Sequence, residues 1–215
     1  MMSVAFEPKT STIPTAEEWY ENLGRVPMHR ILFDPLPGTA TEADVLRLDD
    51  HEDRLCELID GTLVEKVMGF DESQIGMIVG ARLLEFVRKH KLGTVTGSDG
   101  MMRILLRRIR IPDVAYISNE TLAKRAPKSR VPAMAPDIAV EVISDSNTKL
   151  EMSKKLDEYF AAGSKLVWYI DPATRTINVY TSPSEFVTLT MSDVLTGGDV
   201  LPGFEVKVSE LFDIR

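Results

Sequence analysis

The chain has 215 residues, 44% of them hydrophobic and 27% charged, which is the composition of an ordinary globular protein. Its apolar runs fall well short of the roughly 20 residues that a membrane span needs, and its first 20 residues lack the pattern of a signal peptide. The single cysteine, Cys56, excludes an internal disulfide and fits a cytoplasmic protein. The histidines His29, His51 and His90 are too scattered for a zinc site.

The charge is distributed unevenly along the chain. Residues 1–60 hold 13 acidic and 5 basic residues and so account for the whole net charge of −8. Residues 103–130 hold eight lysines and arginines against Asp113 and Glu120, a local charge of +6. This basic segment, Arg103 to Arg130, can attract a polyanion although the whole chain is acidic. A solvated charged loop explains the same pattern equally well.

The first predicted elements are a proline-rich arm, two helices and a hairpin. We expect residues 1–40 to form an extended arm with one short helix near Glu17 to Asn22. Thr41 is the predicted cap of a second helix that ends near Leu48, because acidic residues fill its first turn. The segment CELIDGTLVEKVM predicts a β-hairpin, since two alternating runs flank the turn dipeptide Asp60-Gly61.

The middle of the chain alternates between helices and strands. Apolar residues at helical spacing predict a long helix from Asp71 to Lys91 that packs on a sheet. TVTGSDG and RILLRRIRIPDVAYIS are predicted strands around a glycine-rich turn, and a basic loop follows over residues 119–136. The apolar run from Ile138 to Ile143 predicts a strand with both faces buried. A helix from about Lys149 to Ala162 comes next, and Gly163 ends it.

The C-terminal part predicts further hairpins. KLVWYIDPATRTINVYTS turns at Asp171-Pro172, and a last turn at Gly197-Gly198 precedes the tail PGFEVKVSELF. Helices alternating with strands and hairpins predict one α/β or α+β layer fold around a mixed sheet. We expect an N-terminal arm over residues 1–40 and a single domain over residues 41–215.

Two carboxylates lie in apolar strands. Asp113 is expected to share a strand face with Ile109 and Ile111, and Glu141 lies in the middle of the buried run. If the two strands are neighbours, the carboxylates converge, and neither has an obvious base nearby. Mg²⁺ prefers carboxylate oxygens and retained water, and would compensate both charges. Binding of each carboxylate to backbone amides or to an arginine such as Arg103 is an equally good explanation.

Asp137 is a poor partner for Glu141. Two residues four apart on one strand lie roughly 13 Å from each other, too far for a single ion with bonds of about 2.1 Å. We therefore expect Asp137 to start the strand or to cap a neighbouring element.

Other charged residues are candidates for the same site. Lys155 flanks the buried stripe of its helix, so its amine can reach the strand end and support phosphate chemistry. Lys149 is a weaker candidate, and simple burial of the lysine stem along apolar surface explains Lys155 without any function. Glu57, in the hairpin, is a candidate third carboxylate, whereas Glu72 suits the first turn of the long helix better than an ion.

The order of these segments resembles a known family. CELIDGTLVEKVMG, RIPDVAYIS, PDIAVEVISDSNT with KKLDEYFAAGSKLVWYIDP, and LTGGDVLPGFEVKVSELF are similar to the Uma-two family of restriction-endonuclease-like proteins, over nearly all of residues 41–213. Such proteins belong to the PD-(D/E)XK nuclease superfamily. By this likeness Asp113 matches the first acid of the motif and Glu141 the second. Ile143 stands where the motif has its lysine, and Lys155 matches a lysine moved to the following helix.

The resemblance implies a restriction-endonuclease-like mixed β-sheet flanked by helices, here with an additional N-terminal hairpin and arm. It also implies Mg²⁺-dependent hydrolysis of phosphodiester bonds in DNA, with Mn²⁺ as a substitute, by a homodimer. Asp113 and Glu141 would be the metal ligands, and Lys155 and Glu57 further catalytic residues. The basic segment would bind backbone phosphates.

Two other functions fit the same sequence. One is a catalytically silent module that keeps the fold and binds or assembles a partner, with the acidic first 60 residues covering the basic segment. The other is a nuclease that acts on RNA or on structured DNA.

Overall fold

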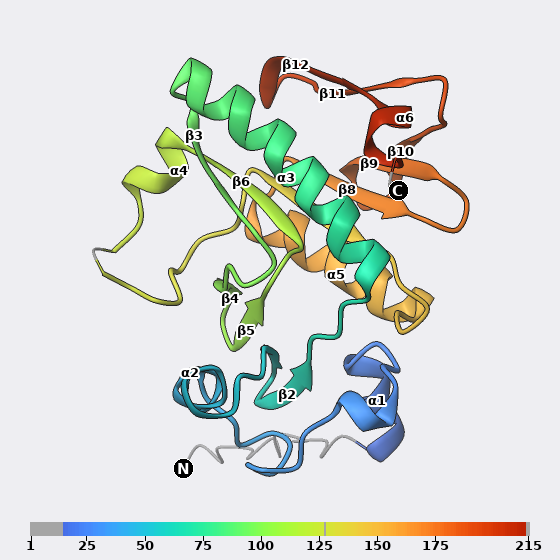
Figure 1. Ribbon diagram of the computed structural model, residues 1–215. Helices are drawn as coiled ribbons and strands as arrows, with labels where there is room; N and C mark the ends of the chain where they lie inside the picture. The colour runs from blue at the N-terminus through green and yellow to red at the C-terminus, as the bar shows by residue number, and fades with distance from the viewer. Residues whose placement is uncertain (1–14, 127, 214–215) are drawn as a thin grey trace, which may run out of the picture.

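The chain forms a mixed six-stranded β-sheet with a long helix on each face (Figure 1). The computed structural model describes residues 15–126 and 128–213. The neighbouring strands of this sheet are, in order, β10 (Glu185–Leu189), β9 (Thr176–Ser182), β8 (Leu166–Asp171), β7 (Ile138–Val142), β6 (Val114–Ser118) and β3 (Gly93–Thr96). β7 and β8 run parallel and the other neighbours antiparallel, so the predicted mixed sheet is confirmed.

The two covering helices are α3 (Phe70–His90) and α5 (Lys149–Ala162), both within a residue of their predicted bounds. Thr148 caps α5, and Gly163 ends it in the left-handed region at φ 104°. Side chains alternate along β7, so Val140 packs in the core with α3 while Ala139 packs in the core with α5. Glu141 therefore points to the side of α5.

A second, four-stranded antiparallel sheet lies beside the first. Its strands are, in order, β2 (Thr62–Glu65), β1 (Cys56–Ile59), β5 (Arg108–Arg110) and β4 (Met102–Leu105). β1 and β2 form the predicted hairpin, and its turn residues Asp60 and Gly61 both have positive φ, 48° and 81°, as a type I′ turn requires. Helix α2 (Glu42–Glu52), begun by Thr41 as predicted, supplies Val45 and Leu48 to the core of this sheet.

The segment RILLRRIRIPDVAYIS is divided between the two sheets. β4 and β5 form a hairpin of the small sheet, and the chain enters the large sheet at Val114. Pro112 has no N–H for a ladder hydrogen bond and stands between the two strands. The expectation that Asp113 shares a strand face with Ile109 and Ile111 was therefore wrong, since these two isoleucines pack in the core under α2.

Residues 15–40 are packed rather than loose. The predicted short helix is confirmed as α1 (Ala16–Asn22), and a 3₁₀ turn, η1 (Met28–Arg30), follows. Leu23, Val26 and Ile31 are buried against Ile59 and Val64 of the β1–β2 hairpin. The expected extended arm is therefore wrong for this stretch, while residues 1–14 lie outside the described part of the chain.

The remaining elements are short. The basic loop contains α4 (Asn119–Ala123), and β10 extends the predicted 166–182 hairpin into a third strand. β11 (Val194–Gly197), β12 (Leu201–Lys207) and α6 (Val208–Leu211) complete the core on the α3 side. Among the described helices, none combines the length and the apolar character that crossing a bilayer requires.

Candidate active site

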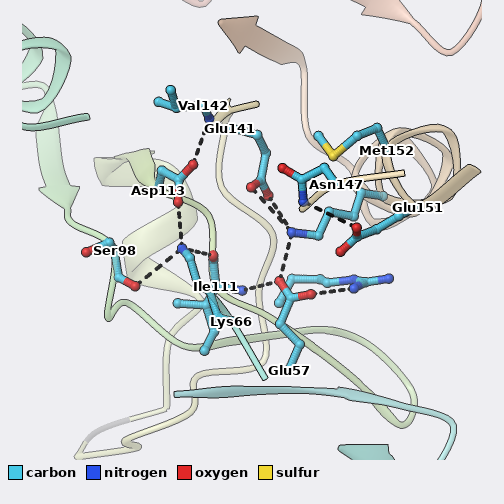
Figure 2. Close-up of polar contacts among 12 residues, drawn as sticks. Glu57, Lys66, Ser98, Ile111, Asp113, Glu141, Val142, Asn147, Glu151 and Met152 are labelled. Atoms are coloured by element: carbon cyan, nitrogen blue, oxygen red, sulfur yellow. Dashed lines mark hydrogen bonds and ion pairs between the residues drawn. The ribbon is translucent and has the colours of Figure 1, made fainter. Parts of the chain in front are cut away.

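Asp113 and Glu141 meet where β6 and β7 run side by side. The strands are antiparallel neighbours, with Val114 opposite Val140. The Asp113 amide donates to the Val140 carbonyl at 3.0 Å, and Asp113 Oδ2 accepts from the Val142 amide at 2.7 Å. Both carboxylates are buried, 7% and 4% exposed. The strands are therefore neighbours, as the convergence of the two acids required, and both acids line one small cavity, Asp113 beside Lys66 and Glu141 beside Lys155 (Figure 2).

Lys66 is the cation beside Asp113. It follows β2 directly, and its Nζ lies 2.8 Å from Asp113 Oδ1, 2.5 Å from the Ile111 carbonyl and 3.4 Å from the Ser98 carbonyl (Figure 2). The ammonium thus lies in a cage of oxygens. The expectation that Asp113 lacks a nearby base was wrong, and so was the candidate partner Arg103, which pairs with Glu42 at 3.0 Å.

Lys155 lies where the helix pattern predicted it. Its side chain is 4% exposed, and its Nζ reaches Glu141 at 3.4 Å and Glu57 Oε1 at 3.2 Å. Burial lowers the pKa of Lys155, but the charges of Glu141 and Glu57 outweigh burial and raise it above its ordinary value. Lys155 is therefore a fixed cation, suited to stabilise negative charge and unsuited to accept a proton.

Glu57 faces Lys155 and not Asp113. It accepts from Arg110 Nη1 at 2.6 Å and from the Ile111 amide at 3.2 Å. Burial raises the pKa of Glu57, yet the charges of Lys155 and Arg110 outweigh burial and bring the pKa to about 2. The carboxylate is thus ionised, and its partners hold Lys155 in position.

The surroundings of Glu141 disfavour its ionised form. Burial raises its pKa, Lys155 opposes this, and the charge of Asp113 adds to the rise. The Tyr159 hydroxyl donates to Glu141 Oε1 at 2.5 Å, and burial together with that carboxylate raises the pKa of Tyr159 well above its usual range. An additional positive charge at Glu141 would therefore be favourable.

A small cavity of ≈ 20 Å³ lies between these groups, room for about one water-sized sphere. Its lining includes Asp113, Glu141, Lys66, Lys155 and Glu72. Mg²⁺ is commonly bound by one or two carboxylates and keeps several waters, so Asp113 and Glu141 fit it as a donor pair. Among the described residues no cluster of three or more acidic, histidine or cysteine side chains is arranged to bind an ion. Asp113 and Glu141 are therefore the two carboxylates at this cavity that could hold an ion together with water.

Glu72 and Asp137 occupy the positions expected of them. Glu72 lies in the first turn of α3, and it also reaches the edge of the small cavity. Asp137 accepts from the Ser118 amide at 2.7 Å and pairs with Lys165 at 2.8 Å. It therefore caps the start of α4, away from the site.

A buried ion pair that the sequence did not reveal joins the N-terminal segment to α5. The Arg30 guanidinium binds Glu151 at 2.9 and 3.1 Å, and both side chains are at most 4% exposed. Arg30 also lines the small cavity. The only sequence signal was indirect: Thr148 and Glu151 form a capping box, which explains Glu151 without any partner.

The basic segment is largely neutralised within the molecule. Four of its arginines form ion pairs with acids at residues 42–60: Arg103 with Glu42, Arg108 with Asp60, Arg110 with Glu57, and Arg130 with Asp49 and Asp50. Arg110 is buried, whereas the side chains of Arg103 and Arg130 are 45% and 52% exposed. Only the exposed pairs can exchange partners with a phosphate at low cost.

Comparison with known proteins agrees with this architecture. The family model of Uma2, described as putative restriction endonuclease, matches residues 42–209. No curated protein gives a significant match. The structure is similar to the crystal structure of a putative nuclease belonging to DUF820 from Anabaena variabilis ATCC 29413, with a TM-score of 0.67 and 17% identity over 74% of this chain and 90% of that one. The fold is restriction-endonuclease-like, as predicted, and because the family model spans most of the sequence, the chain belongs to the Uma2 family of putative restriction endonucleases.

Proposed function

We propose that this protein is a Mg²⁺-dependent endonuclease that hydrolyses phosphodiester bonds in DNA. Its membership in the Uma2 family and its nuclease fold support hydrolysis of nucleic acid. The observation that carries the proposal is the meeting of Asp113 and Glu141, from neighbouring strands, in a cavity that Lys155 also lines.

Each residue has a role that follows from its surroundings. Asp113 and Glu141 would hold the Mg²⁺ ion, or Mn²⁺ in its place. When bound, such an ion lowers the pKa of a coordinated water and polarises the phosphate. Lys155, a fixed cation, would stabilise the negative charge that develops on the phosphate. Glu57 would hold the Lys155 ammonium in position.

Lys66 sets the resting charge of the site. It neutralises Asp113 through the 2.8 Å ion pair, so it competes with any cation for that carboxylate. Contacts to the DNA backbone are proposed for the exposed arginines of the basic segment, Arg103 and Arg130. A homodimeric state and a cytoplasmic location stay predictions.

The proposal is tested by Asp113→Asn and Glu141→Gln, which keep the shape of each side chain. We expect each to lower Mg²⁺-dependent cleavage of plasmid DNA by at least about a hundredfold, since each removes an ion ligand and its charge. Asp137→Asn is the matched control, because this carboxylate belongs to the other Pro-Asp pair and lies outside the site. Thermal melts of all three proteins establish that each is folded.

Cleavage at the wild-type rate in both folded variants would refute the assignment. Calorimetric titration with Mn²⁺ gives a second readout, and we expect binding that is lost in both variants.

The alternative, a catalytically silent module, is supported by one observation. Both carboxylates already have cationic partners, Lys66 at Asp113 and Lys155 at Glu141. A wild-type protein that binds neither Mg²⁺ nor Mn²⁺ and cleaves neither DNA nor RNA would establish this function.

A further inference from the structure

A second, larger cavity adjoins the candidate active site. It has a volume of ≈ 290 Å³ and lies between α3 and the segment 95–98, at the end of β3. Met68 and Asp113 line both this cavity and the small one that holds the carboxylates. A molecule bound at the carboxylates can therefore extend directly into the larger cavity.

The walls of the larger cavity are mostly apolar and include glycine backbone. Gly76 and Gly80 of α3 line one side, and Gly97 lies in the segment on the other side. A Cβ atom placed on Gly76 would meet no atom within 4 Å, so the helix leaves open space there. Met68 and Met77 add flexible thioether side chains that adapt to the surface of a ligand.

The size and chemistry of this space fit one nucleoside. Its volume is close to the lower end of small-molecule sites, about 300–1,000 Å³. An apolar space whose walls include glycine backbone can accommodate a flat ring. Asp113 lines both cavities, and the phosphate of a substrate would lie beside it in the smaller one. The nucleoside attached to that phosphate is then the part of the substrate next to the larger cavity.

We propose that this cavity binds the nucleobase of a nucleotide beside the scissile phosphate, and that the preferred substrate has an unpaired base at that position. The inference rests on the proposed function, because the phosphate at the carboxylates brings the base to the cavity. A base in a duplex is stacked on both faces and must be extruded first, which costs least in a single strand or at a mismatch. Single strands, flaps and mismatched duplexes are therefore the preferred substrates.

Gly76→Leu tests the proposal by filling the cavity. The new side chain has room, and the loss of a helical glycine favours the helix, so the variant is expected to fold. Gly76→Ala is the matched control, with the same gain in helix propensity and little added volume. Binding is measured by fluorescence anisotropy in EDTA, with a labelled single strand, the same strand carrying abasic sites, and the fully paired duplex.

We expect Gly76→Leu to weaken binding of the intact single strand by about tenfold or more, while Gly76→Ala stays within about twofold of wild type. Wild-type protein should bind the intact strand more tightly than the abasic one, and the duplex affinity should be unchanged in both variants. The binding experiment needs neither metal nor cleavage. Its result therefore does not depend on whether the protein is active as a nuclease, and failure of the two proposals can be distinguished.

Three results would overturn the proposal. The first is equal affinity of both Gly76 variants for the intact strand. The second is equal affinity of wild type for intact and abasic strands, or no binding to either. The third is a change of oligomeric state in Gly76→Leu on size-exclusion chromatography, because the cavity would then belong to an interface between two copies of the chain.

Discussion

Lys155 compensates two buried carboxylates that come from different sheets. Glu57 belongs to β1 of the small sheet and Glu141 to β7 of the large one, and both lie within 3.4 Å of the Lys155 ammonium. Removing one partner of a buried pair leaves an uncompensated charge, which costs far more than the loss of an exposed pair. Lys155 therefore supports the fold as well as the proposed chemistry.

Lys155→Met should lower the free energy of unfolding by about 3–5 kcal/mol, measured by urea denaturation. The control is Lys124→Met, whose ion pair with Glu120 is exposed on both sides, 68% and 76%, and should cost less than about 1 kcal/mol. The double variant Lys155→Met with Glu141→Gln should regain part of the lost free energy of unfolding, because the buried Glu141 carboxylate, now without Lys155, is replaced by an uncharged amide. Equal losses for Lys155→Met and Lys124→Met would contradict this account.

At the level of elements, Arg30 connects three parts of the chain that are distant in sequence. Its guanidinium binds Glu151 in the first turn of α5, the Ser146 carbonyl before α5, and the Glu65 carbonyl at the end of β2. The segment that carries it, residues 15–40, packs on the face of the β1–β2 hairpin that holds Ile59 and Val64. This contact fixes α5, and with it Lys155, relative to the small sheet.

Arg30→Met should lower the free energy of unfolding by about 3 kcal/mol, because Glu151 is left buried without its partner. Amide hydrogen exchange should rise across α1 and η1, which lose their ion pair to α5 and keep the hydrogen bond from Thr148 to the Gly24 carbonyl. Arg47→Met is the control, since its ion pair with Glu52 lies on the surface, 41% and 43% exposed. Unchanged exchange in α1 and η1 would show that the Arg30–Glu151 pair does not hold the segment, and that apolar packing and the remaining hydrogen bonds do.

At the level of the whole molecule, acidic residues near the N-terminus neutralise arginines of the basic segment. Five acids of residues 42–60 pair with arginines of the basic segment, so much of the positive charge of that segment is already neutralised within the molecule. The covering of the basic segment, expected from the sequence for a silent module, is present in a protein with the nuclease fold. DNA binding at this surface requires exposed pairs to open.

Asp49→Asn with Asp50→Asn frees Arg130 from both carboxylate partners. If Arg130 contacts DNA, the affinity in EDTA should rise, and the slope of log K against log salt should steepen by about 0.9, the value for one added phosphate contact. Glu185→Gln with Glu205→Gln is the control, because it changes the net charge equally on exposed residues of β10 and β12. Identical gains in both double variants would place the DNA elsewhere.

The helices, the hairpin and the orientation of Lys155 followed from local patterns, whereas the meeting of Asp113 with Glu141 depended on which strands pair. Periodicity marked α3 and α5, the Asp-Gly turn marked the β1–β2 hairpin, and the helical stripe of α5 oriented Lys155 toward the strand end. These features depend on neighbours a few residues apart, so the amino-acid sequence by itself determined them.

The partners of the buried charges were decided only by the tertiary structure. Lys66 meets Asp113, Arg30 meets Glu151, and Glu57 turns to Lys155 because two sheets and the N-terminal segment pack against one another. A lone lysine after a strand carries no local sign of the carboxylate that it will face. Ion pairs between distant segments arise from how the elements dock, and the docking depends on the summed burial of many apolar side chains, which no short stretch of sequence encodes.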